Sequence, residues 1–222
     1  MAKVKRRLRP WFKTVLVLLV ILAITFGGLQ CYKLLRPKDS SIDQNTIRQK
    51  SAAQIIEVPA FVQQQYLSQP SSRNQLALGQ VRGIVIHYVG NPGTTAAQNR
   101  SYFNKPDTMV NSHFIVGLGG EVVQCIPLTE QSCASNNRNA DTISIETCHP
   151  DESGKFNEAT YNSLVRLTAW LCNAYGLDSD SVIRHYDITG KECPKYFVEH
   201  PESWKQFRQD VQKGMEENIW KT

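Results

Sequence analysis

The longest run of hydrophobic positions lies near the beginning of the chain. Residues 14–32 contain no charged side chain, and Val15 to Ile24 consists almost entirely of valine, leucine and isoleucine. A segment that is apolar on every side has no polar face to turn toward water. As a helix, these nineteen residues span about 28 Å at roughly 1.5 Å per residue, close to the thickness of a bilayer core. The pattern therefore predicts a transmembrane helix over residues 14–32.

The rest of the chain separates into segments of different polarity. Residues 33–54 are rich in Gln, Ser and charged side chains, which predicts a polar linker. Residues 55–79 mix short apolar patches with Gln, Pro and Ser, and we expect an arm that wraps over the domain. The globular domain itself is expected over residues 80–218, and the sequence contains no internal repeat.

Within the expected domain, hydrophobic positions recur with the periods of both strands and helices. The run from Gly83 to Tyr88 is apolar and β-branched, as in a central strand that is buried on both faces. Further strands are predicted at 112–116, 121–126, 142–148 and 182–185, and helices at 95–104, 159–175 and 201–218. Glycines at 117, 119 and 120 predict a hairpin between the second and third strands. Strands and helices alternate, so we expect an α/β fold with a central mixed β-sheet flanked by helices.

The positive charge of the chain is concentrated at one end. Six of its 25 basic residues lie in residues 1–13, and the remainder holds 19 basic and 20 acidic residues. This balance gives no reason to expect a nucleic-acid partner. Six cations precede the apolar span, whereas only Lys33 and Arg36 follow it closely. The asymmetry predicts a cytoplasmic tail over residues 1–13 and an extracytoplasmic domain on a single-pass cell-membrane protein.

Two alternatives to a retained anchor remain open. A cleaved secretory signal needs small residues at its cut site, and Phe26 to Gln30 fits that requirement poorly. A lipoprotein signal would place Gly or Ala before Cys31, where the chain has Gln30. The sequence favours the retained anchor.

The six cysteines permit up to three disulfides in an extracytoplasmic protein. Cys125 and Cys133 are a candidate pair. Cys172 lies on an apolar helical stripe, which predicts a buried thiol. Cys193 is a candidate metal ligand instead of a disulfide partner.

Three side chains are candidate zinc ligands. His87 and His185 each end a predicted strand, and Cys193 follows His185 by eight residues. Imidazole and thiolate are good zinc donors, and three protein ligands leave one position open for water, as in catalytic sites. Taken singly, each histidine is as readily explained by an ordinary hydrogen-bonded role.

Two charged residues are candidates for a role beside such a metal. Glu146 lies in an alternating strand, in which Ile143 and Ile145 point to one face and Ser144 and Glu146 to the other. A carboxylate on that face is costly when buried without a partner, but it suits a base that acts on water. Lys191 precedes Cys193 by two residues and is expected to stabilise an oxyanion.

Several ordered blocks together resemble a known family. Gly83–Tyr88, Ser112–Phe114, Ile143–Glu146 and Arg184–Pro194 are similar to the zinc-dependent N-acetylmuramoyl-L-alanine amidases of type 2. That family includes phage lysozyme-like amidases and the peptidoglycan recognition proteins. The resemblance covers roughly residues 56–217, and the segment from His185 to Pro194 is its most specific part.

The resemblance implies a role for each matching residue. His87, His185 and Cys193 are the implied ligands of Zn²⁺, Glu146 is the implied general base, and Lys191 the implied oxyanion stabiliser. Some relatives carry a catalytic tyrosine just before the hairpin histidine, but this chain has Ser112 there. The base role therefore shifts to Glu146.

Peptidoglycan is the implied partner of a monomeric domain. His113 is expected to line the cleft, or else to be structural. Asn137 and Arg138 are expected to bind carboxylates and amides of stem peptides, or else to belong to an ordinary polar loop. The implied reaction is hydrolysis of the amide bond between the lactyl group of N-acetylmuramic acid and L-alanine. A non-catalytic peptidoglycan-binding module is the alternative, and a membrane anchor or assembly factor with an incidental domain is a third.

Overall fold

The computed structural model describes residues 56–68 and 72–221. The predicted basic tail (1–13), transmembrane span (14–32) and polar linker (33–54) lie outside these residues. Among the described residues, none of the helices combines the length and apolar character needed to cross a membrane.

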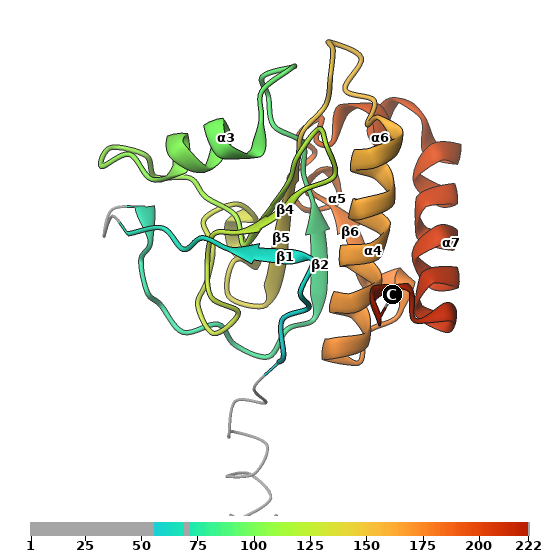
Figure 1. Ribbon diagram of the computed structural model, residues 1–222, viewed down its shortest axis with the longest axis horizontal. Coiled ribbons are helices and arrows are strands. Elements are labelled where there is room, and N and C mark those ends of the chain that lie inside the picture. The colour runs from blue at the N-terminus through green and yellow to red at the C-terminus, as the bar shows by residue number, and fades with distance from the viewer. Residues whose placement is uncertain (1–55, 69–71, 222) are drawn as a thin grey trace, which may run out of the picture. The chain divides into compact units, whose positions relative to one another are not determined.

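A six-stranded mixed sheet forms the centre of the described part of the chain (Figure 1). Its spatial order is β1-β4-β3-β5-β2-β6. The strands are β1 (Val62–Gln64), β2 (Gly83–Ile86), β3 (Phe114–Val116), β4 (Val122–Gln124), β5 (Thr142–Thr147) and β6 (Val182–Arg184). Only β3 and β4 of these strands pair antiparallel, as the predicted hairpin, and the other neighbours are parallel. The α/β prediction with a mixed sheet is confirmed.

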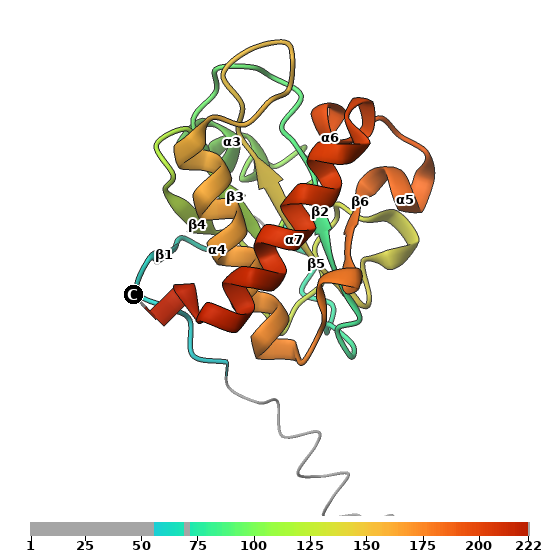
Figure 2. The same ribbon diagram turned by 90° about the vertical axis from the view of Figure 1, so that its right-hand side faces the viewer.

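Helices cover both faces of this sheet (Figures 1 and 2). The long helices α4 (Glu158–Tyr175) and α7 (Pro201–Glu217) pack side by side over one face, and α3 (Ala96–Phe103) lies over the other. The short helices are α5 (His185–Thr189) and α6 (Lys195–Glu199), with 3₁₀ turns η2 (Asn136–Arg138), η3 (Ser179–Ser181) and η4 (Ile219–Lys221). Helix α4 begins at Asn157, whose side chain accepts a bond from the Thr160 N–H, and ends at Gly176 in the left-handed conformation.

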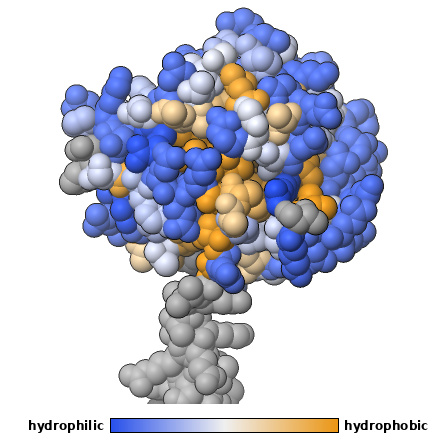
Figure 3. Space-filling view, viewed as in Figure 1, coloured by the Kyte–Doolittle hydropathy of each residue, from blue (hydrophilic) through white to orange (hydrophobic). Residues whose placement is uncertain are grey.

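Two hydrophobic clusters hold these layers together. One lies between the sheet and the helices α4 and α7, and it includes Ile143 and Ile145 of β5. The other lies beneath α3 and includes Ile115 and Cys148. The predicted alternation along β5 is therefore confirmed, and the fully buried β2 is confirmed as a central strand. In Figure 3 the outer surface on the α7 side is mostly hydrophilic, which fits a helix with one buried stripe.

The segment predicted as an arm contributes to the sheet. Strand β1 pairs in parallel with β4 at the sheet edge. Beyond the strand, the backbone N–H of Leu67 donates to the Cys125 carbonyl at 2.9 Å. One compact unit spans Ile55–Thr222, so this segment and the predicted domain belong to the same body.

Some local predictions are wrong. Strand β6 stops at Arg184, and His185 begins α5 instead of ending the strand. The candidate disulfide between Cys125 and Cys133 is not formed, because Cys125 is buried in the cluster beneath α3 whereas Cys133 lies at a pocket. Cys172 is a buried free thiol, as predicted.

Candidate active site

A pocket of about 890 Å³ opens where β2, β5 and β6 end. These three neighbouring strands are parallel, so their carboxyl ends meet at one edge of the sheet. His87 follows β2 and Glu146 lies near the end of β5, while His185 follows β6. All three line the pocket, together with Cys193 and Lys191. The topology thus gathers residues that are distant in sequence into one cleft.

The three candidate metal ligands converge in this pocket. Nitrogen atoms of His87 and His185 and the Cys193 sulfur all lie within 4.8 Å of one another. The Nδ1 atom of His87 is 3.8 Å from the Sγ atom of Cys193. The two imidazole ring centres are 4.6 Å apart, and all three residues are buried. The spacing suits a single shared ion.

Backbone and side-chain bonds hold these donors in place. The His87 N–H donates to the Ile145 carbonyl at 2.9 Å, which extends the pairing of β2 with β5. The Tyr186 N–H donates to the Cys193 carbonyl at 2.9 Å and ties the start of α5 to the cysteine loop. Beside it, Arg184 forms an ion pair with Asp187 at 2.7 Å. Hydrogen bonds therefore tie His87 to β5 and the Cys193 loop to α5.

The donor atoms fit a metal such as zinc. The Nδ1 atom of His185 is buried and has no hydrogen-bond partner among the described residues. A buried nitrogen without a partner is costly unless something else binds it. Two imidazoles and one thiol form a donor set typical of zinc, and three protein donors leave a coordination position open.

Burial governs the protonation of the donors. It lowers the pKa of His87 well below its usual value, with smaller contributions from His185 and Lys191. Burial also lowers the pKa of His185, again helped by Lys191. Both imidazoles therefore stay neutral, which is the form that binds metals. Burial raises the pKa of the Cys193 thiol to about 12, so a bound cation would have to displace its proton.

Glu146 and Lys191 are the charged groups nearest this cluster. The Oε2 atom of Glu146 is buried in the pocket without a hydrogen-bond partner among the described residues. Burial raises the pKa of this carboxyl to about 8, and the Lys191 charge opposes the rise. A carboxyl that titrates near neutral pH can both accept and donate a proton.

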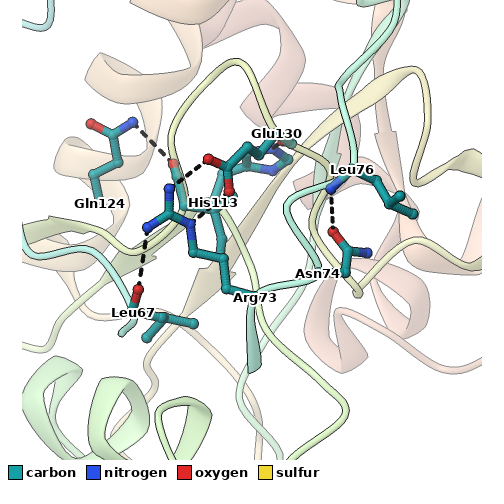
Figure 4. A network of polar contacts seen from close by, with 8 residues as sticks. Leu67, Arg73, Asn74, Leu76, His113, Gln124 and Glu130 are labelled. Carbon is teal, nitrogen blue, oxygen red and sulfur yellow. Dashed lines mark hydrogen bonds and ion pairs between the residues drawn. The ribbon is translucent and has the colours of Figure 1, made fainter. Parts of the chain in front are cut away.

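The remaining predicted site residues lie elsewhere. His113 is fully buried and is not among the residues that line the pocket, so the structure places it in the structural role given as the alternative. Its Nδ1 atom accepts from the Ser144 N–H at 3.1 Å. Its Nε2–H donates to the carbonyl of Glu130 at 2.9 Å, and Figure 4 shows these two residues close together. Asn137 is exposed but outside the pocket lining. Arg138 forms an ion pair with Asp141 instead of facing the cleft.

Other residues of the cleft were missed by the sequence. Asn136 and Asn139 of the same loop line the pocket, in place of Asn137 and Arg138. The pocket lining also includes the exposed side chains of Tyr102, Met109 and Val110. Tyr102 lies within the predicted helix over residues 95–104, and Met109 and Val110 follow it. Their signal in the sequence is a hydrophobic character that the core does not use.

Comparison with known proteins assigns this arrangement to a family. Residues 77–196 match the family model described as N-acetylmuramoyl-L-alanine amidase. The chain belongs to this amidase family. The resemblance inferred from the sequence blocks is therefore confirmed.

Curated members of the amidase family are clearly similar to this chain. The N-acetylmuramoyl-L-alanine amidase CwlL of Bacillus licheniformis is 31% identical over 157 residues, which cover 63% of this chain and 43% of CwlL. The amidase BlyA of Bacillus subtilis is 30% identical over 165 residues, which cover 65% of this chain and 44% of BlyA. The chain thus spans less than half the length of these relatives.

Solved amidase-family structures share the fold. A mutant endolysin from Bacillus subtilis superposes with a TM-score of 0.59 at 24% identity, over 68% of this chain and 97% of the endolysin. The Staphylococcus aureus hydrolase AmiA, solved with its ligand, gives a TM-score of 0.58 at 20% identity. That match covers 80% of this chain and 91% of AmiA.

Proposed function

We propose that this chain is a zinc-dependent peptidoglycan hydrolase. It cleaves the amide bond between the lactyl group of N-acetylmuramic acid and L-alanine. One observation carries the proposal: the donors of His87, His185 and Cys193 meet in the same pocket as the buried Oε2 atom of Glu146, which has no hydrogen-bond partner among the described residues. The family membership and the names of the relatives supply the substrate class.

His87, His185 and Cys193 would hold the ion. When bound, zinc supplies a Lewis acid and lowers the pKa of water toward about 7. The open side of the pocket leaves room for substrate beside these donors. The lining of the pocket includes both apolar side chains, such as Tyr102 and Met109, and polar ones, such as Asn136 and Lys191, so a ligand with both apolar and polar parts fits it.

The chain's own residues move the proton and hold charge. The Oε2 atom of Glu146 accepts a proton from the attacking water and then donates it to the leaving nitrogen. The Lys191 charge opposes the burial-driven rise in the pKa of Glu146 and so favours its ionised, basic form. The same ammonium stabilises the negative oxygen that develops on the attacked carbonyl.

Digestion of purified peptidoglycan tests this function. Residues 55–222 should release stem peptides with new free L-alanine amines and leave the glycan strands intact. Glu146→Gln should lower the rate by about 10²–10⁴-fold with unchanged metal content, whereas the exposed Glu152→Gln should match the unmodified protein. New reducing sugar ends would contradict the proposed bond. Binding to peptidoglycan without cleavage would support the non-catalytic alternative.

We further propose that residues 14–32 hold a monomeric hydrolase domain on the outer face of the cell membrane. The uncharged span and the excess of cations before it support this topology. Protease added to intact cells lacking a wall should remove the domain and leave the N-terminus protected. Protection of the domain, or its release into the medium without protease, would contradict the anchor.

A further inference from the structure

The Nε2 atoms of His87 and His185 both contact the same loop. The Nε2 atom of His185 lies 2.7 Å from the Oδ1 atom of Asn136. The Nε2 atom of His87 lies 3.5 Å from the Oγ atom of the preceding residue, Ser135. Two consecutive residues between β4 and β5 therefore support both imidazoles on the side away from the cluster.

The contact with Asn136 determines which nitrogen of His185 carries the proton. An amide oxygen can only accept a hydrogen bond, so the Nε2 atom of the neutral ring must be the N–H donor. The Nδ1 atom then has a free lone pair, and this atom is buried without a hydrogen-bond partner among the described residues. A ring nitrogen of His185 lies within 4.8 Å of the donor atoms of His87 and Cys193. If the amide were reversed, a buried N–H would point at the cluster with no acceptor. The donor set of the pocket is consistent only with the first arrangement.

The loop is built to hold this amide. Asn136 adopts a left-handed backbone with φ of +53°, a conformation that asparagine tolerates better than most residues. The side chain of Asn139 closes the turn by accepting from the Ser135 N–H at 2.7 Å and the Ala134 N–H at 3.2 Å. The Arg138–Asp141 ion pair lies on the same turn. These contacts hold the turn that carries the Asn136 side chain.

We propose that Asn136 is a positioning residue that holds His185 in the Nε2–H tautomer, with Nδ1 ready to bind a metal. This inference rests on the proposed zinc site. Partners that orient a metal-binding histidine in this way contribute substantially to metal affinity. Asn136 does not touch the reacting atoms in this role and acts through His185.

Zinc affinity measured by competition with a chelator tests the inference on the full chain purified in detergent. Asn136→Gly keeps the left-handed backbone and removes the amide, and it should weaken zinc binding by about 10–100-fold. Asn136→Asp restores an acceptor and should recover affinity to near the original value. Asn137→Ala, at the exposed neighbouring position, is the matched control and should bind as the unmodified chain.

Nitrogen NMR of the metal-free chain gives a readout independent of metal and activity. At a pH where the rings are neutral, His185 should show the Nε2–H tautomer, and Asn136→Gly should show a mixture. The inference about Asn136 would be overturned by a dominant Nδ1–H tautomer in the unmodified chain. It would also be overturned if Asn136→Gly bound zinc with an affinity within twofold of that of the unmodified chain. Neither result would contradict the proposed zinc site. Failure of the unmodified chain to bind zinc would overturn the proposed metal site as well.

Discussion

Arg73 and Glu130 form a bidentate ion pair that connects the segment before β2 to the loop after β4 (Figure 4). The Nε atom of Arg73 lies 2.6 Å from a carboxylate oxygen of Glu130. The backbone carbonyl of the same Glu130 accepts the bond from His113. The pair therefore connects the N-terminal segment of the fold to a histidine in its interior.

Removal of this pair should destabilise the domain. Arg73→Ala leaves the partly buried Glu130 carboxylate without its partner, and it should lower the free energy of unfolding by about 1–3 kcal/mol. Urea denaturation of residues 55–222 measures the change. Lys205→Ala, which removes an exposed pair with Glu202, is the control and should cost less than about 0.5 kcal/mol. Equal effects of the two changes would contradict the connecting role of Arg73.

His113 should make the stability of the domain sensitive to acid. Burial lowers its pKa from 6.5 to about 4 in the folded protein. The unfolded chain therefore binds a proton first as the pH falls, so stability present above pH 6.5 is lost progressively down to about 4. The loss amounts to about 3 kcal/mol at most.

Comparison of His113→Gln with the unmodified domain isolates this contribution. Urea denaturation across the same pH range should show a shallower acid dependence in the variant. If the variant does not fold, NMR titration of the unmodified domain measures the pKa of His113 directly. A pKa near 6.5 in the folded protein would refute the prediction.

Chelation of metal should lower the melting temperature of the domain. A ligand that binds only the folded state stabilises it by about 2.7 kcal/mol at a concentration 100-fold above its dissociation constant. Thermal unfolding of residues 55–222 with EDTA, and again after addition of zinc, measures this effect. Cys193→Ala should not respond to zinc, whereas Cys172→Ala, outside the cluster, should still respond. An equal response of Cys193→Ala would exclude its sulfur as a ligand.

Loss of the Lys191 charge should shift the pH dependence of hydrolysis. This charge lowers the pKa of Glu146, so Lys191→Met should raise that pKa. Because the ionised carboxylate is the base, the acidic limb of the rate profile should move to higher pH. Lys191→Arg keeps the charge and should leave the limb near its original position. An unmoved limb in Lys191→Met would contradict this electrostatic role.

The main residues of the site could be predicted from the sequence because the sheet topology brings strand ends together. His87, Glu146 and His185 lie at the ends of three strands that become parallel neighbours, so local patterns located them well. The choice between Asn136 and Asn137 depends on a left-handed turn, which sequence periodicity does not encode.

Two other features depend on partners that are far away in the chain. His113 is enclosed by Ser144 and Glu130, and nothing local distinguishes its buried position from a place in the cleft. Strand β1 is a three-residue strand with two glutamines, and only its pairing with β4 makes it part of the sheet.

The strand β2 precedes both of its sheet partners in the chain, so its part of the sheet is completed late in synthesis. This apolar strand leaves the ribosome before either of its partners, β5 and β6, so both of its edges wait unpaired. Exposed strand edges of this kind favour aggregation of incomplete chains. His87 meets Cys193 across 106 positions of the chain. A partly synthesised chain therefore carries no complete donor set, and the capacity to bind metal is among the last properties that the growing protein acquires.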